Sequence, residues 1–175
     1  ASLDLNGSSN SSLGFVRLGI GPDGVCYMLA GDGSTTVVLA SIKPNGVTLN
    51  SSLPPSDQLQ VIDANVSIAG TGVSAADFQN GDLAVLADPQ QGGVKIYALA
   101  NTTGGPTKIF IGKPNGSSTI MTKQWDLVQP DGSPFNVSVN GVAFDMFGSM
   151  YVSSNGGVYF VNAATVNTSG PGTVQ

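Results

Sequence analysis

The residues that usually cover exposed helix faces are nearly missing from this chain. Glutamate is absent, and lysine and arginine together number six among 175 residues. Glu, Lys and Arg are strong helix formers, whereas Gly, Pro, Ser, Thr, Asn and Val, which are abundant here, favour turns and strands. The composition therefore predicts a nearly all-β fold. A chain of this length forms one domain, or one part of a larger ring or array, and it can bury roughly 70% of its unfolded surface.

The charge balance excludes some classes of partner. Aspartate supplies all eleven acidic residues, the net charge is −5, and Arg17 is the only arginine. Nucleic-acid binding needs clustered basic residues, and none cluster here. The longest apolar runs reach about seven residues, far fewer than the ~20 that span a bilayer. We therefore expect no nucleic-acid partner and no membrane insertion.

One local pattern recurs along the chain: a short apolar strand, a tight turn that ends in glycine, and a second strand. It occurs as LGIGPDGVCYMLAG (18–31), AADFQNGDLAVLAD (75–88) and VAFDMFGSMYVSSN (142–155). Glycine at the end of the turn tolerates a positive φ, so Gly24, Gly81 and Gly148 are expected to specify antiparallel hairpins. The central strands carry too many apolar residues for a sheet with one wet face. The pattern predicts repeated sheets that pack against one another on both faces.

The clearest copy, GVAFDMFGSMYVSSNGGVYFVN (141–162), resembles a blade of the NHL-repeat and gluconolactonase-like β-propellers. Blades of that type commonly read G-[VI]-A-[FV]-D-x-x-G-x-[LM]-Y-V-[AS], and the likeness covers less than half of the chain. It implies propeller-like blades of antiparallel sheet, about three or four units, and it implies architecture only. The metal site of the lactonase type needs a Glu, and RNA-binding NHL domains need a basic face, and both are missing. The alternative fold is a β-sandwich completed by strand donation.

The two ends of the chain differ from its middle. We divide the chain into an N-terminal extension or donor strand (1–14), a repeated β-sheet domain (15–166) and a C-terminal tail (167–175). Leu3 and Leu5 alternate with polar residues, so an extended segment would present both on one face. We expect them at a subunit interface, as a strand added to the open sheet edge of a neighbouring copy. The alternative is a frayed tail or a local edge strand.

Asparagine sequons are far more frequent than chance predicts. Eight of the thirteen asparagines begin N-x-[ST], whereas about two would be expected from the Ser and Thr content. These candidate glycosylation sites are Asn6, Asn10, Asn50, Asn65, Asn101, Asn115, Asn136 and Asn167. N-linked glycans would give a chain with so few charges a hydrophilic coat, which indicates an extracellular, secreted or cell-surface glycoprotein. In the alternative, the sequons are incidental to a Ser/Thr/Asn-rich adhesin-like chain.

Groups that carry acid–base or nucleophilic chemistry are scarce. Histidine and glutamate are absent, there is one cysteine, and no nucleophile elbow, phosphate-binding loop or Cys/His metal spacing occurs. Bonding the local backbone is the common role of aspartate beside glycine or a turn, and this is the position of Asp23, Asp32, Asp82, Asp131 and Asp145. We therefore expect no catalytic residues, no metal site and no cofactor besides glycans, with structural calcium held by loop oxygens left as an alternative.

The chain has one tryptophan and one cysteine. Trp125 is expected to be a buried core or interface anchor, and the alternative is an exposed platform for a sugar ring. Cys26 is expected to be an inert core thiol, and the alternative is an intermolecular bridge. Together the patterns predict a non-enzymatic extracellular structural glycoprotein whose copies assemble into a filament, sheath or surface layer through strand edges. The alternative function is a carbohydrate-binding or adhesion module of a cell-surface protein.

Overall fold

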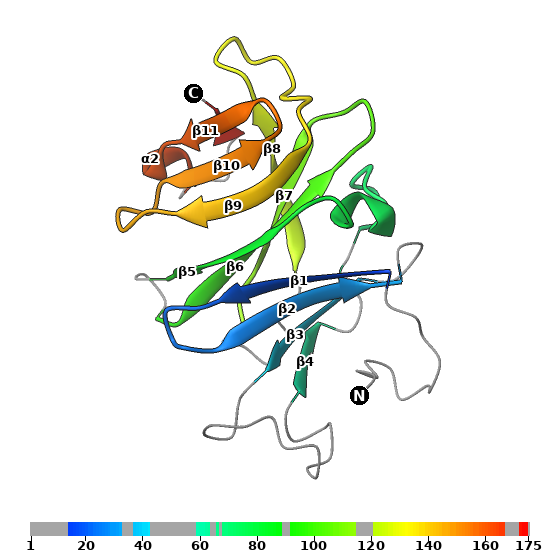
Figure 1. Cartoon of the computed structure of the whole chain (residues 1–175), viewed down its shortest axis with the longest axis vertical. Coiled ribbons are helices and arrows are strands. Elements are labelled where there is room, and N and C mark those ends of the chain that lie inside the picture. Colours follow the sequence, from blue (N-terminus) through cyan, green and yellow to red (C-terminus); the bar gives the residue numbers. More distant parts are fainter. Residues whose placement is uncertain are drawn as a thin grey trace.

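A computed structural model describes residues 14–32, 37–42, 59–63, 66, 68–88, 92–114, 121–166 and 172–174 of the chain. In these residues the protein is nearly all β, with one 3₁₀ helix and one short α-helix (Figure 1). The strands are β1 (Phe15–Ile20), β2 (Cys26–Gly31), β3 (Val37–Ile42), β4 (Leu59–Asp63), β5 (Leu83–Ala87), β6 (Val94–Asn101), β7 (Thr107–Gly112), β8 (Thr122–Val128), β9 (Val139–Phe144), β10 (Met150–Ser154), β11 (Gly157–Val161) and β12 (Gly172–Thr173). The helices are η1 (Ala75–Phe78) and α2 (Ala163–Val166).

The strands form three sheets in which consecutive strands pair antiparallel, and β12 adds to β8 of the second sheet in parallel. The first sheet has the order β1-β2-β3-β4, the second β12-β8-β7-β6-β5, and the third β11-β10-β9. Up-and-down sheets of three or four strands are the units of which propeller blades are made. The prediction of an all-β fold with propeller-like blades is confirmed, with three such sheets among the described residues.

The turn glycines confirm two of the three predicted hairpins. Gly24 has φ 75° and Gly148 has φ 85°, and they lie in the β1–β2 and β9–β10 turns. Gly81 has no positive φ and follows the 3₁₀ helix η1 rather than a strand. Glycine is required at position 81 because a Cβ atom there would overlap the carbonyl oxygen of Leu99. The second copy of the motif therefore begins with a 3₁₀ turn whose sequence resembles that of the strands in the other two copies.

The second sheet lies between the other two and is buried on both faces. On β6, Ile96 and Ala98 face a core shared with Leu29 and Leu39 of the first sheet. The alternate residues, Tyr97 and Leu99, face a second core shared with Val139, Met150 and Val152 of the third sheet. All of these side chains are at most 1% exposed. The expectation that sheets pack on both faces is confirmed for this central sheet.

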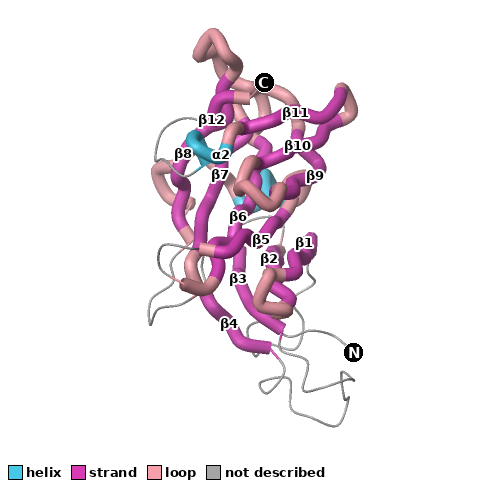
Figure 2. The backbone as a smooth tube through the Cα atoms, turned by 90° about the vertical axis from the view of Figure 1, so that its left-hand side faces the viewer, coloured by secondary structure: helices cyan, strands magenta, loops and turns pink. Residues whose placement is uncertain are grey.

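The C-terminal strand β12 corrects the expectation of a tail over 167–175. Gly172 and Thr173 pair in parallel with Leu127 and Val128 of β8, and the Val174 N–H donates to the Val128 carbonyl oxygen at 2.9 Å. Val174 also bridges to Val161 of β11, so the segment links the second and third sheets. Figure 2 shows β12 beside β8 and close to α2. Residues 1–13 and 167–171 lie outside the described residues.

Candidate functional site: a groove between three edge strands

The first strand of every sheet is an edge strand, and these three strands lie next to one another. β1, β5 and β9 each pair with a single neighbour, and β5 contacts both β1 and β9 (Figure 1). An edge strand has a row of main-chain N–H and C=O groups that its own sheet does not pair. The edges of all three sheets therefore converge on β5.

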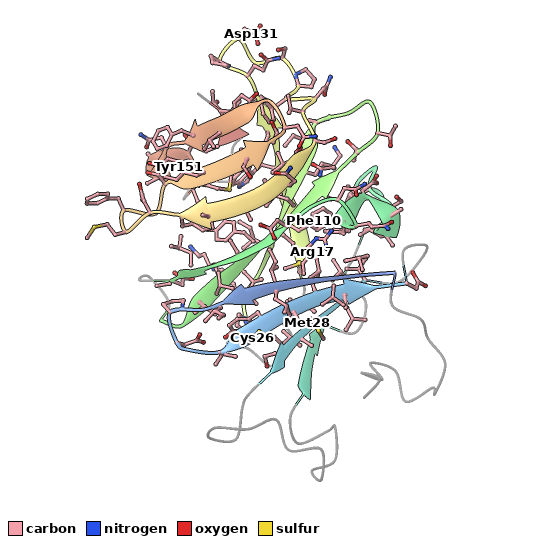
Figure 3. All side chains as sticks on the ribbon, viewed as in Figure 1. Arg17, Cys26, Met28, Phe110, Asp131 and Tyr151 are labelled. Carbon is pink, nitrogen blue, oxygen red and sulfur yellow. The ribbon has the colours of Figure 1, made fainter. Side chains whose placement is uncertain are left out.

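Arg17 fastens β1 to the segment that leads into β5. Its Nε donates a hydrogen bond to the carbonyl oxygen of Gly81 at 2.7 Å, and an Nη atom donates to the carbonyl oxygen of Gln79. Figure 3 shows Arg17 where the first sheet meets the second. The planar guanidinium presents several donors in a fixed fork, so one side chain holds two carbonyl groups of this turn.

Asp82 fastens the same segment to the third sheet. Its Oδ2 accepts a hydrogen bond from the backbone N–H of Val142, on the edge strand β9, at 2.8 Å. A carboxylate that accepts from a backbone N–H makes a charge-assisted bond, which is stronger than a neutral one. We expected Asp82 to bond its own turn, and instead it joins two sheets.

Asn101 completes this junction from the end of β6. Its Nδ2 donates to the carbonyl oxygens of Asn80 and Val139, both at 2.7 Å. Its Oδ1 accepts from the Val139 N–H and the Thr107 hydroxyl, both at 3.0 Å. An amide nitrogen has two hydrogens, so both donors of Asn101 are used. A residue expected to carry a glycan thus acts as an internal clamp between the second and third sheets.

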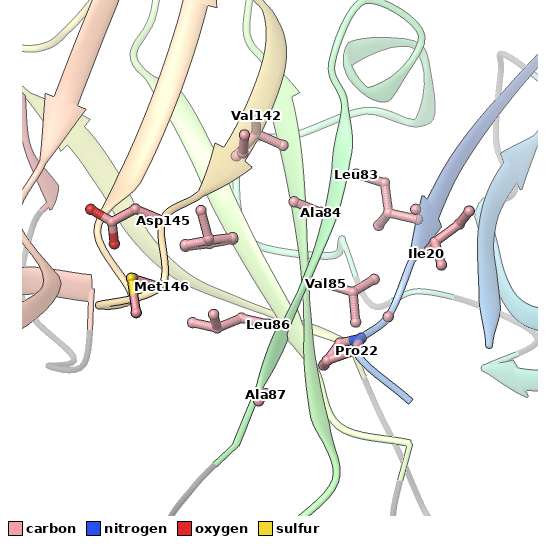
Figure 4. A pocket seen from close by; sticks show the side chains of 14 residues that line it. Ile20, Pro22, Leu83, Ala84, Val85, Leu86, Ala87, Val142, Asp145 and Met146 are labelled. Carbon is pink, nitrogen blue, oxygen red and sulfur yellow. The ribbon is translucent and has the colours of Figure 1, made fainter. Parts of the chain in front are cut away.

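A groove opens beyond this junction, with β5 between β1 and β9 (Figure 4). Its volume is about 530 Å³, and it is lined by residues 19–22, 83–87 and 142–146. Asp145 is the only lining residue with a polar side chain. The remaining polar atoms of the groove are therefore main-chain groups, set between apolar walls.

Asp145 is committed to its own turn. Its Oδ1 accepts hydrogen bonds from the N–H groups of Phe147 and Ser149, both at 2.9 Å. Desolvation acts to raise the pKa of this carboxyl, but the hydrogen bonds from Ser149 and Phe147 outweigh it and hold the pKa below its usual range. Asp23 and Asp131 likewise bond the N–H two residues ahead, of Val25 and Ser133. The turn-bonding role expected for these three aspartates is confirmed.

Exposed apolar side chains surround the groove and continue onto the two ends of the stack. On the first sheet, Val16, Leu18 and Ile20 of β1 are 38%, 56% and 76% exposed. On the third sheet, Tyr151 is 38% exposed and Val158 70% exposed. Figure 3 places Tyr151 and Cys26 on sheets at opposite ends of the molecule. Both terminal sheets of the stack therefore present apolar surface.

The β9–β10 turn projects the two most exposed large apolar side chains of the described residues. Met146 is 90% exposed and Phe147 77% exposed. Large apolar side chains that reach solvent singly are common, but adjoining ones beside an apolar groove mark a contact surface. The same turn supplies Met146 to the rim of the groove.

Most of the remaining predicted site residues lie outside the described part of the chain. Asn136 is exposed, whereas Leu3, Leu5 and the remaining sequons Asn6, Asn10, Asn50, Asn65, Asn115 and Asn167 lie outside the described residues. Trp125 is 3% exposed within the second core, which confirms the buried reading and removes the sugar platform proposed for it. Cys26 is free and half-buried, so its thiol is less enclosed than expected, because it begins β2 beside the exposed Ile20.

Among the described residues, no group of three or more His, Cys, Asp or Glu side chains lies close enough together to hold a metal ion. Neither described helix has the length and apolar content needed to cross a membrane.

Comparison with known proteins gives no family. No family profile matches the sequence, and no curated protein matches it. Among solved structures, a bifunctional GH43-CE protein of Bacteroides eggerthii is similar, with a TM-score of 0.43 and 14% sequence identity. The similarity covers 84% of this chain and 16% of that protein. The resemblance to NHL-type blades stays a prediction.

Proposed function

We propose that this protein is a non-enzymatic extracellular structural glycoprotein whose copies assemble into a filament, sheath or surface layer. The observation that carries the proposal is the pair of apolar surfaces on the two terminal sheets of the stack. Val16, Leu18 and Ile20 form one, and Tyr151 and Val158 belong to the other. These are different surfaces at opposite ends of one molecule.

Contact between unlike surfaces is what allows assembly to continue. When one end of a molecule binds the other end of its neighbour, each added copy exposes the same surface again. Such head-to-tail contacts generate rings if the rotation closes and filaments if it does not.

The chemistry of the chain favours a structural role over catalysis. Histidine and glutamate are absent, so general acid–base chemistry would fall to aspartate. The aspartates of the turns and of the sheet junction already accept hydrogen bonds from backbone N–H groups. The proposal therefore assigns no substrate and no cofactor to the groove.

An extracellular setting fits the surface. A chain with 10% charged residues needs another hydrophilic coat, and the sequons other than Asn101 supply sites for one. Asn136 lies exposed in the loop between β8 and β9. Glycans at such positions would keep most of the surface soluble and leave the apolar ends available for contact.

Charge placed on either terminal surface tests the proposal. Leu18→Lys and Val158→Lys alter exposed side chains, so the fold should persist, and each should raise the concentration needed for assembly by about tenfold or more. Light scattering and negative-stain microscopy measure this. Gln129→Lys, on the exposed β8–β9 turn, adds the same charge elsewhere and should change nothing. Wild-type protein that stays monomeric at high concentration would refute the proposal.

A further inference from the structure

We propose that the Met146–Phe147 turn of one copy inserts into the β5 groove of a second copy, and that the contact is reciprocal. This inference rests on the proposed self-assembly and names a second, lateral contact within it. The occupant is another copy of this chain, because the surface carries both the projecting side chains and the hollow that would receive them.

The projecting turn and the groove lie next to each other on the surface. Met146 lies on the rim of the groove, and Phe147 follows it at the tip of the same turn. A two-fold axis relates a surface to itself, so each residue of one copy meets its counterpart site on the other. A projection that adjoins its own receptor site suits this symmetry, because both turns can enter both grooves at once.

The groove is lined mainly by apolar side chains. Figure 4 shows Ile20 and Val85 on one side of β5 and Leu86 on the other. An apolar aromatic ring and a thioether match such walls, and methionine adapts to irregular gaps. Apart from Asp145, the groove has no charged lining residue that an occupant would have to pair with.

Hydrogen bonds hold the projecting turn in one conformation. Gly148 adopts φ 85°, and the Gly148 N–H donates to the Asp145 carbonyl oxygen at 3.1 Å. The bonds from Phe147 and Ser149 to the Asp145 carboxylate hold the same four residues. A side chain presented on a preorganised turn loses less conformational freedom on binding than one on a loose loop.

Disulfide trapping between two variant chains tests the contact. In a Cys26→Ser background, one chain carries Phe147→Cys and the other Ala87→Cys, a position on the exposed end of the groove. Oxidation of the mixture should give a covalent heterodimer. It should be at least about tenfold more abundant than the covalent homodimer that either variant forms alone. The control pairs Gln129→Cys with Ala87→Cys, and it should give only background cross-linking.

Two untrapped variants complete the experiment. Phe147→Ser removes the ring, and Ala87→Trp fills the groove without touching either core, so each should weaken lateral pairing by roughly tenfold. Analytical ultracentrifugation of dilute protein measures pairing. Cross-linking no greater than the Gln129→Cys control, or pairing unchanged in both variants, would overturn the inference. If Leu18→Lys still reduces polymer formation in that case, the proposed function survives and only the lateral contact is lost.

Discussion

The Nε atom of Arg17 lies 2.7 Å from the carbonyl oxygen of Gly81 and donates a hydrogen bond to it, across 64 residues of sequence. Gly81 precedes β5, and Arg17 is part of β1. Asp82 and Asn101 bond the third sheet from the same region. Three polar side chains thus set the positions of the edge strands, and through them the shape of the groove.

Replacement of Arg17 should show how much this junction stabilises the stack. Arg17→Lys keeps the charge but cannot reproduce the forked donors, so we expect a loss of about 1–3 kcal/mol in the free energy of unfolding. Urea denaturation followed by circular dichroism measures it. Lys108→Arg, near the start of β7, keeps the ion pair with Asp126 and is the matched control. Equal stability of Arg17→Lys and wild type would show that the junction contributes little.

Asn101 and Asn136 should differ in glycan occupancy. Glycan attachment replaces a hydrogen on Nδ2, and both Nδ2 hydrogens of Asn101 bond the carbonyl oxygens of Asn80 and Val139. Asn136 is exposed. Glycopeptide mass mapping of protein secreted from a glycosylating host should find glycan at Asn136 and an unmodified Asn101. Full occupancy of Asn101 in folded protein would contradict this reading of the junction.

The stability of the same asparagine gives an independent check. Asn101→Ala leaves the carbonyl of Val139 and the hydroxyl of Thr107 without this partner in a part-buried setting, so we expect a loss of about 2–4 kcal/mol. Asn136→Ala alters an exposed side chain and should cost less than about 0.5 kcal/mol. Differential scanning calorimetry of unglycosylated protein separates the two. A thermal midpoint for Asn101→Ala that matches Asn136→Ala would argue against a clamp.

Alkaline pH should unfold the protein in a tyrosine-dependent way. Burial, with the negative charge of Asp88 as the second cause, raises the pKa of Tyr97 to about 12. Burial, and then the hydrogen bond to Asp23, raises the pKa of Tyr27 as well. The unfolded value is about 10, so the folded phenols hold their protons more tightly. Their contribution is complete below about pH 10 and is lost as pH rises through the folded pKa.

The measurement compares denaturant midpoints at pH 8 and pH 11, with absorbance near 295 nm reporting tyrosinate. Between pH 8 and pH 11 the loss of unfolding free energy from Tyr97 should be about 1.4 kcal/mol. Tyr97→Phe has no phenol to ionise, so its stability should fall less between the two pH values than that of wild type. Identical pH profiles for the two proteins would show that another group controls alkaline unfolding.

Local patterns in the sequence predicted the sheets, and long-range bonds decided the junction. The alternation and turn glycine of 142–155 correspond to β9 and β10, because both features depend on neighbouring residues. The same pattern failed at 75–78, where the Asp77 carboxylate accepts from the Ser74 N–H at 2.7 Å and supports a 3₁₀ turn. A strand and a short helical turn can carry similar apolar residues, and only the capping bond distinguishes them here.

The candidate site was harder to predict. Arg17 is the only arginine of a chain with few charges, and such a residue often has a specific internal partner. Taken with the other charges, it indicates only that basic residues do not cluster for nucleic-acid binding. Asn101 carried a sequon that concealed its structural role. No local spacing indicates that Asp82 reaches Val142, because the two residues are 60 positions apart. The groove exists only once three edge strands meet.

The last prediction concerns the C-terminal strand and the single tryptophan. A Cβ atom at Gly172 would come within 2.3 Å of the Trp125 ring, so any larger residue must displace β12 or the indole. Gly172→Val should therefore expose Trp125, shift its fluorescence to longer wavelength and lower the free energy of unfolding by about 1–3 kcal/mol. Thr173→Ala changes the half-buried neighbour without entering the ring and should leave the emission unchanged. Because Trp125 is the only tryptophan, the emission reports this site alone, and an unshifted spectrum in Gly172→Val would mean that β12 does not cover the indole in solution.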